Sequence, residues 1–314
     1  MRSTAHVHNP DHHIFAGHAA LATVQLCFGL FPVIGTLAFA PGGLSPLAVG
    51  GWRIVAGSLA LGILARARHG PRARPHARDI PVFVICAVLG VALNQGLFLI
   101  GLSRSTPMNA GLVMSLIPVF TFGIAALVRQ ERFSLTRAAG IVIALAGVTP
   151  LLFARGLGGL GAHGLGNLLM VANSICYSCF LVLSKVLTRR YPALVIAAWS
   201  YIFSLGAAPF FAYGQVLLPA PWATTAWWSL VYILVVPTVI AYLLNMFALA
   251  RVRASTVAVY VYAQPIIAGL ASWWVFGERP TPAMLLGAPA LFMGIWLVGR
   301  KPPPVRVVTR PPES

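Results

Sequence analysis

Charged side chains are scarce in this sequence of 314 residues, so each one inside an apolar stretch is a candidate for chemistry. Glu278 ends a stretch that begins at Pro265, where a carboxylate could transfer a proton, line a path or hold a helix end. Arg53 lies near the middle of another stretch, in GGWRIVAG, where it could bind an anionic group or the carbonyl groups of a helix end. No acid or histidine falls in the middle of a stretch, so we expect neither an enzyme active site nor a buried proton relay.

Three patterns that are typical of cofactor or metal sites occur in unsuitable surroundings. Cys176 and Cys179 have the CxxC spacing, but they lie within an apolar stretch without a thioredoxin-like turn. The glycines of RGLGGLGAHGLGN include a GxGxxG spacing, but no strand precedes them, so we interpret the segment as a flexible linker. The histidines of HVHNPDHH lie on a polar tail. We therefore expect no catalytic residue, no metal and no cofactor.

The composition indicates an integral membrane protein. Hydrophobic residues make up 59% of the sequence and charged residues 9%, which is more apolar surface than one soluble core can bury. The apolar runs are continuous rather than alternating, which favours helices over a barrel. We therefore expect an all-α integral membrane fold with ten transmembrane helices, at about 15–40, 44–66, 80–102, 106–128, 134–154, 163–188, 192–213, 224–249, 253–276 and 282–299.

The net charge of +17 could indicate nucleic-acid binding, but the positions of the cations indicate membrane topology instead. If the amino terminus is cytoplasmic, eighteen of the 22 Lys and Arg residues fall on the cytoplasmic side and three on the other. The positive-inside rule then places both termini in the cytoplasm, with the chain crossing the inner (plasma) membrane. We accordingly expect no nucleic-acid partner.

The chain contains an internal repeat at an offset of 147 residues. Each copy holds five helices, an odd number, so the second copy must cross the membrane in the opposite direction as an inverted repeat. The matched pairs are Pro118 and Pro265, Glu131 and Glu278, Arg132 and Arg279, Gly140 and Gly287, and Gly147 and Gly294. The glycines suit close helix packing, within the chain or between the subunits of a homodimer. We expect disordered cytoplasmic tails at 1–14 and 301–314, repeats at 15–155 and 163–300, and a Gly-rich linker at 156–162.

The residues that close the fourth helix of each copy also carry a family resemblance. A proline within this helix, a glutamate at its end in VRQERFS and FGERPTP, and a following helix such as AGIVIALAGV resemble the EamA-type transporters of the drug/metabolite transporter superfamily. The likeness covers about residues 17–300. It implies ten helices, inner termini and export of amino acids or related metabolites. It also implies a structural role for Arg53, because that family commonly has an arginine there.

Polar residues within the apolar stretches are candidates for a substrate pathway, because a membrane interior disfavours them unless they act in function or join helices. Pro237 and Gly90, which match at the offset, each weaken a helix that carries polar residues further along. The candidate pathway residues are Trp52, Arg53, Asn94, Gln95, Asn109, Asn173, Tyr177, Trp199, Tyr242, Asn245, Tyr260 and Gln264. The candidate hinge or latch residues are Pro118, Glu131, Pro237, Pro265 and Glu278, with the two glutamates tethering helix ends.

We therefore expect a secondary transporter that exports small neutral or zwitterionic metabolites, such as amino acids, by alternating access of the inverted repeats. Its expected partners are a small-molecule substrate and the lipid bilayer. One alternative is an exporter of drugs or organic cations, for which Trp199, Tyr177 and Tyr260 could form an aromatic cage, although the acid is missing. Another is a membrane-embedded enzyme or scaffold, for which the spans offer no cluster of reactive groups.

Overall fold

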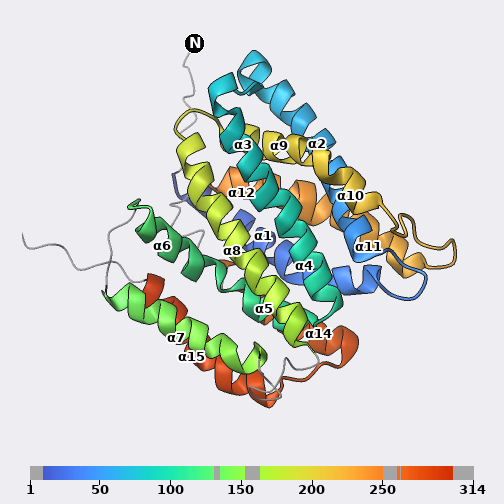
Figure 1. Cartoon of the computed structure of the whole chain (residues 1–314), viewed down its shortest axis with the longest axis vertical. Helices are drawn as coiled ribbons and strands as arrows, with labels where there is room; N and C mark the ends of the chain where they lie inside the picture. The colour runs from blue at the N-terminus through green and yellow to red at the C-terminus, as the bar shows by residue number, and fades with distance from the viewer. Residues whose placement is uncertain (1–9, 131–134, 153–162, 250–259, 262, 300–314) are drawn as a thin grey trace, which may run out of the picture.

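The computed structural model is all-helical over the residues that it describes, which are 10–130, 135–152, 163–249, 260–261 and 263–299 (Figure 1). The first half contains α1 (Pro10–Ala38), α2 (Pro46–His69), η1 (Gly70–Ala73), η2 (Ala77–Asp79), α3 (Ile80–Ala87), η3 (Val88–Ala92), α4 (Leu93–Ser103), α5 (Pro107–Met114), α6 (Ile117–Leu127) and α7 (Leu135–Leu152). The second half contains α8 (Gly164–Leu187), α9 (Ala193–Ser204), η4 (Leu205–Ala207), α10 (Ala208–Ala212), α11 (Thr224–Val235), η5 (Val236–Ile240), α12 (Ala241–Leu249), α14 (Ala263–Phe276) and α15 (Pro282–Gly299).

The described helices include segments that are long and apolar enough to cross a membrane. Six described helical segments of at least 18 residues meet this condition, and four shorter apolar helices accompany them. Large side chains on their outer faces are exposed, among them Ile63 at 69% and Trp274 at 88%. Such surfaces would be covered by lipid tails, because water would make them a liability for aggregation. The chain is therefore a multi-pass membrane protein.

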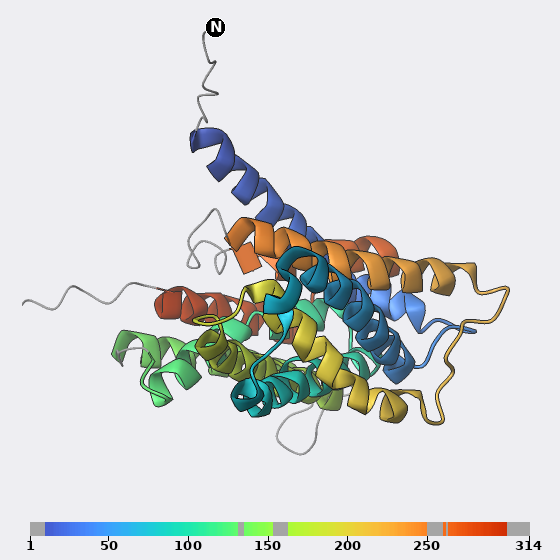
Figure 2. The same cartoon turned by 90° about the horizontal axis from the view of Figure 1, so that it is seen from above.

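The first helix begins earlier than the sequence suggests. Residues 10–14, which we expect to belong to a disordered tail, are instead the first turns of α1, and in Figure 2 this end projects beyond the neighbouring helices. Pro10 suits a first helical turn because its missing amide proton would have no partner there. The extension also carries the unpaired amides of the helix start away from the apolar segment.

Helices α7 and α15 form a pair at one edge of the molecule (Figure 1). Their glycines make backbone contact in a reciprocal pattern: a Cβ on Gly147 would lie 2.4 Å from the amide nitrogen of Leu291, and one on Gly294 would lie 2.4 Å from that of Ala144. Adding 147 to the numbers of Ala144 and Gly147 on α7 gives Leu291 and Gly294 on α15. The glycines thus pack the two helices of the same chain together, which is one of the two roles expected for them.

The other helix contacts correspond at the same offset. Helix α1 packs against α14 and α12, and its counterpart α8 packs against α6 and α4. Helix α2 packs against its own counterpart, α9. The two π-helical turns, η3 and η5, interrupt corresponding helices at positions that differ by 148 residues. These turns lie where Gly90 and Pro237 predict weak points, and π turns often mark functional sites.

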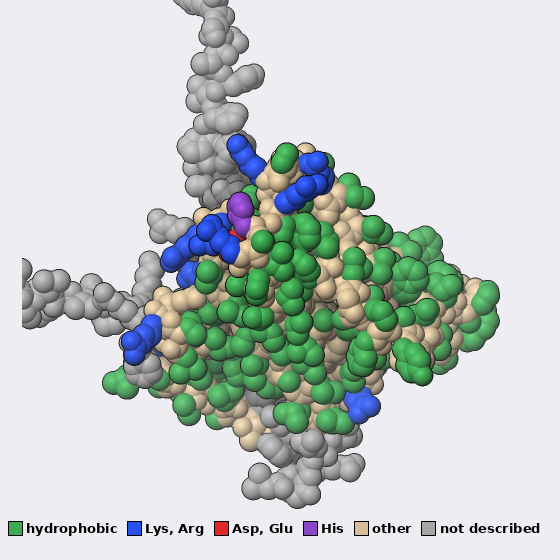
Figure 3. All heavy atoms as spheres, turned by 45° about the horizontal axis from the view of Figure 1, so that its top comes forward, with side chains coloured by type: hydrophobic (Ala, Val, Ile, Leu, Met, Phe, Trp, Pro, Cys, Tyr) green, Lys and Arg blue, Asp and Glu red, His purple; other side chains and the backbone are tan. Residues whose placement is uncertain are grey.

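Lys and Arg side chains gather at one end of the molecule. Figure 3 shows them near the upper edge, with a broad hydrophobic surface below. The described residues include eight exposed cations at the ends of α2, α3 and α8 and in the adjoining turns: Arg66, Arg68, Arg72, Arg74, Arg78, Lys185, Arg189 and Arg190. An uneven distribution of this kind is what the positive-inside rule describes, and it marks this end as the candidate cytoplasmic face.

Candidate functional site

Arg53 lies at the centre of a buried polar cluster. Its residue is 8% exposed, its Nε donates a hydrogen bond to Thr238 Oγ1 at 3.1 Å, and Tyr201 is a further hydrogen-bond partner. The guanidinium carbon lies 4.5 Å from the centroid of the Phe31 ring, a distance suited to a cation–π interaction. Helices α1, α2 and α9 and the turn η5 therefore all contribute to the surroundings of one buried cation.

The chain forms η5 because Pro237 cannot complete the helical hydrogen-bond pattern. Proline has no amide proton to give to the carbonyl four residues earlier, which is that of Ile233. In its place, Thr238 Oγ1 donates to the Ile233 carbonyl at 2.7 Å and at the same time accepts from Arg53. The carbonyl freed by Pro237 is thereby satisfied within the protein, and Arg53 is attached to the irregular turn of its neighbouring helix.

Two buried amide side chains near this cluster have polar atoms without a hydrogen-bond partner. Both polar atoms of Gln95 are unpaired at 3% exposure. Asn173 donates through Nδ2 to the Asn94 carbonyl at 2.5 Å, but its Oδ1 is unpaired. Unsatisfied buried amides are uncommon and indicate a missing polar partner, such as water or a ligand.

The positions of these amides connect them with Arg53. Gln95 lies one turn before Phe98 on α4, and the Phe98 ring stacks on Phe31 with centroids 5.2 Å apart. Phe31 in turn lies against the Arg53 guanidinium. Asn173 lies on α8, which packs against α4. The cluster therefore continues from α2 through the two phenylalanines to α4 and α8.

Tyr177 completes the cluster on α8. It lies one turn after Asn173, on the same helix face, and its hydroxyl is within electrostatic range of Tyr201. Its ring packs against Phe180 with centroids 5.7 Å apart. The structure thus groups four predicted pathway residues around one centre: Arg53, Gln95, Asn173 and Tyr177. It adds Tyr201 and Thr238 to them.

Two other predicted pathway residues, Gln264 on α14 and Tyr260, contact α1. Gln264 Nε2 donates to Gln25 Oε1 at 2.7 Å, and the Tyr260 hydroxyl lies 2.9 Å from His18 Nδ1. His18 and Gln25 are seven residues apart and so share one face of α1, the spacing by which the sequence could have revealed them. These side chains form polar contacts along one face of α1 and are not among the described contacts of Arg53.

Asn109 lies at a helix end rather than at the centre. Its Nδ2 donates to Ser105 Oγ at 3.2 Å, while its backbone amide bonds to the Thr106 hydroxyl, which caps α5. Ser105 in turn donates to Asn167 Oδ1 at 2.5 Å on α8. The Asn109 side chain therefore belongs to a capping network.

The two predicted tryptophans hold loops at opposite ends of the α2 and α9 pair. Trp52 Nε1 donates to the Leu217 carbonyl at 2.7 Å, in the segment after α10. Trp199 Nε1 donates to the Ala73 carbonyl, in the segment after α2. The tryptophans match at the offset of 147, so each of the two helices contributes one indole bond to the loop of the other half. Neither indole N–H bonds to the Arg53 cluster.

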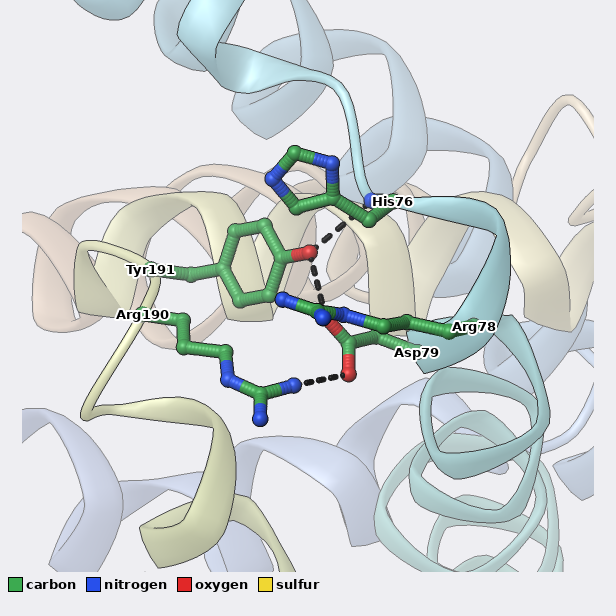
Figure 4. Close-up of polar contacts among 5 residues, drawn as sticks. All are labelled: His76, Arg78, Asp79, Arg190 and Tyr191. Carbon is green, nitrogen blue, oxygen red and sulfur yellow. Dashed lines mark hydrogen bonds and ion pairs between the residues drawn. The ribbon is translucent and has the colours of Figure 1, made fainter.

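A second set of contacts fixes the loop between α2 and α3 to the loop before α9 (Figure 4). Asp79 accepts hydrogen bonds from Arg190 Nη1 at 2.7 Å and from the Tyr191 hydroxyl at 2.7 Å, and Arg78 lies at 4.0 Å. The Tyr191 hydroxyl accepts from the backbone amide of His76 at 2.8 Å. Burial raises the pKa of Tyr191, so its hydroxyl keeps the proton that it donates. The sequence does not predict this cluster, because its members are separated by more than a hundred residues.

Glu278 contacts the start of another helix. Its Oε2 accepts from the Met108 backbone amide at 3.4 Å, in the first turn of α5, and from the Ser272 hydroxyl. A carboxylate at a helix N-terminus is favourable because the unpaired amides there carry partial positive charge. The corresponding Glu131 lies outside the described residues.

The remaining predicted hinge residues lie at or near helix starts. Pro118 is the second residue of α6, directly after the break at Ser115 and Leu116 that separates α5 from α6. Pro265 is the third residue of α14 as described. Tyr242 and Asn245 belong to α12, but their side chains lie outside what the structure describes.

Comparisons with known proteins agree with this architecture. The EamA-like transporter family matches residues 15–153 and again residues 164–300. A probable terminal-alkyne amino-acid exporter of Streptantibioticus cattleyicolor is 28% identical over 255 residues, which cover 79% of this chain and 82% of that protein. The uncharacterized transporter YdfC of Bacillus subtilis is 28% identical over 290 residues, covering 87% and 90%.

A solved crystal structure also superimposes on this chain. It covers 91% of this chain and 96% of its own, with a TM-score of 0.62 and 21% sequence identity, so the two share a fold. The family match confirms the resemblance seen in the sequence, and the relatives named as transporters exclude the enzyme alternative. The chain belongs to the EamA-like transporter family and is a multi-pass membrane transporter of small molecules.

Proposed function

We propose that this transporter exports amino acids or similar neutral or zwitterionic metabolites across the inner membrane by alternating access. In this proposal, ten transmembrane helices form two inverted five-helix repeats, both termini are cytoplasmic, and the polar cluster around Arg53 lies on the substrate pathway. The contacts at both ends of the α2 and α9 pair would join the two halves to each other there.

The correspondence of contacts at the offset of 147 carries this proposal. The reciprocal contacts of Gly147 and Gly294, the mirrored indole bonds of Trp52 and Trp199, and the π turns η3 and η5 all recur at or next to this offset. Two halves with equivalent contacts but opposite directions have two arrangements of similar energy, one open to each side. That is the structural requirement for alternating access.

The character of the central cluster supports the substrate class. Its side chains are amides, phenol groups and one guanidinium, which suit a small solute with polar groups of either sign. The positive charge of Arg53, without a carboxylate among its described partners, disfavours organic cations. A relative named as a probable amino-acid exporter agrees with this class.

Counterflow into proteoliposomes tests the function. Vesicles loaded with one unlabelled L-amino acid should accumulate the same radiolabelled amino acid, and protein-free vesicles should not. The Tyr177→Phe variant should lower the rate, because it removes a hydroxyl of the central cluster, while Tyr213→Phe should not, because Tyr213 is 87% exposed in a loop. If no member of an amino-acid panel exchanges through the wild-type protein, the proposed substrate class is wrong.

A separate experiment tests the topology. A reporter that is active only outside the cytoplasm, fused into the loop at residues 67–78, should stay silent. Activity of this reporter would overturn the orientation that the cations indicate.

A further inference from the structure

The Arg53 guanidinium is a buried cation whose described partners are all neutral. These partners are the Thr238 hydroxyl, the Tyr201 hydroxyl and the Phe31 ring. The carboxylates of Asp79 and Glu278 are bound elsewhere, in the loop cluster and at the start of α5. A buried charge without an opposite charge is costly in a membrane interior, so the site favours an anion supplied from outside the chain.

The Arg53 guanidinium has more N–H groups than its described partners can accept. Thr238 Oγ1 accepts from Nε, and the guanidinium carbon lies over the Phe31 ring. The Tyr201 hydroxyl is the other described hydrogen-bond partner, and arginine carries five N–H groups, so donors remain for a further acceptor. A planar carboxylate fits paired N–H groups of this kind through two parallel hydrogen bonds.

Gln95 provides a second, independent indication of a missing ligand. Its side chain is more than nine-tenths buried, yet neither its amide nitrogen nor its oxygen has a partner. It lies on the face of α4 that carries Phe98, whose ring stacks on Phe31 beside Arg53. The amide nitrogen of Gln95 could donate to a carboxylate, and its oxygen could accept from an ammonium or hydroxyl group on the same ligand.

We propose that Arg53 and Gln95 form a subsite for the carboxylate of the transported solute. This inference rests on the proposed function and specifies which end of the substrate the protein recognises. Solutes without the carboxylate would leave both the guanidinium and the Gln95 amide unpaired, and sites built on buried polar groups reject such analogues strongly. The transporter should therefore distinguish an amino acid from its amide.

Competition in proteoliposomes tests this subsite. Exchange of radiolabelled L-leucine, L-phenylalanine and L-threonine is measured against the unlabelled amino acid or its carboxamide. In the wild-type protein, the carboxamide should compete about 10- to 100-fold less well, the range expected for loss of charge-assisted hydrogen bonds. Arg53→Gln should bring the two competitors within about threefold of each other, and Arg53→Lys should retain part of the difference.

Gln95→Met tests the subsite with Arg53 in place, and should also reduce the discrimination. Gln25→Met is the matched control, because it removes another buried amide whose partner, Gln264, lies on a different helix pair. It should leave the ratio between acid and amide unchanged. Size-exclusion chromatography of each variant reports folding, so a folded variant with unaltered ratio is informative.

Three results would overturn the inference. Equal competition by acid and amide in the wild-type protein would exclude carboxylate recognition, although amino-acid transport itself would stand. Full discrimination by folded Gln95→Met and Arg53→Lys alike would exclude these residues. If exchange falls when chloride is replaced by methanesulfonate, and if the acid and the amide compete equally, the subsite belongs to an inorganic anion. Lack of exchange of every amino acid would instead reject the proposed function, and this inference with it.

Discussion

Replacing Gly147 by alanine should force α7 away from α15. The added Cβ would lie 2.4 Å from the Leu291 amide nitrogen and 2.7 Å from the Gly287 carbonyl oxygen. Ordinary contact needs about 3.5 Å, so the helices must separate by roughly 1 Å. Both contacts are with backbone, which cannot turn aside, so we expect a cost near 3 kcal/mol, the upper part of the usual range for overpacking. The better helix propensity of alanine offsets about 1 kcal/mol, which leaves a net loss of about 2 kcal/mol.

The reciprocal contact makes this prediction specific. Gly294→Ala should destabilise by a similar amount, because its Cβ would meet the Ala144 nitrogen at 2.4 Å. The double variant should lose about 1 kcal/mol less than the sum, because one separation of the helices relieves both clashes. Gly123→Ala is the matched control, since its Cβ meets a flexible side-chain atom of Ile141 at 3.5 Å.

The assay is the unfolding midpoint of the purified protein in a fixed detergent, titrated with a denaturing detergent. Gly123→Ala should be as stable as the wild type or slightly more so. If Gly147→Ala equals this control, the helices do not meet at these glycines. If the two single losses add fully in the double variant, the contact is not shared as the structure describes it.

Four further substitutions test the contacts at the ends of the helices. Glu278→Gln should destabilise the protein by about 1 kcal/mol, because it removes the negative charge at the start of α5, and an unchanged thermal midpoint would contradict this. Trp52→Phe and Trp199→Phe should each accelerate amide hydrogen exchange, the first in the segment after α10 and the second in the segment after α2; the same pattern from both variants would refute the mirrored arrangement. Asp79→Asn should loosen the α2–α3 loop in the same assay, and the effect should shrink at high salt because Arg190 is half exposed.

Much of the architecture could be predicted from the sequence because a membrane imposes strong constraints on each helix. Continuous apolar runs predicted helix positions that agree with the described bounds to within a few residues, apart from the start of α1 and the start of the span at 253–276, where residues 253–259 lie outside the described residues. Gly90 and Pro237 indicated where two helices would be irregular, because glycine lowers helix propensity and proline removes a backbone hydrogen bond. These signals are local, and so they can be read without knowing what lies beside them.

The composition of the central cluster could be predicted only in part, because it depends on which helices meet. Trp52 and Trp199 are polar enough to line a pathway, yet their indoles bind loop carbonyls. Thr238 and Tyr201 are common residues in membrane helices, and only the position of Arg53 gives them a role. Asp79 is the clearest case, since both of its hydrogen-bond donors, Arg190 and Tyr191, come from a loop more than a hundred residues away.

The contrast between a repeated scaffold and an unrepeated centre bears on how the transporter works. The glycine contacts, indole bonds and π turns recur in both halves, but the residues around Arg53 do not. At the offset of 147, Arg53 corresponds to Ser200, Thr238 to Val91 and Tyr201 to Ile54, so the second half has no equivalent cation. In the proposed mechanism, the symmetric scaffold rocks between two similar arrangements while the asymmetric centre holds the substrate in one orientation. Substitutions in the scaffold should therefore change rate and stability, whereas substitutions around Arg53 should change which solutes are carried.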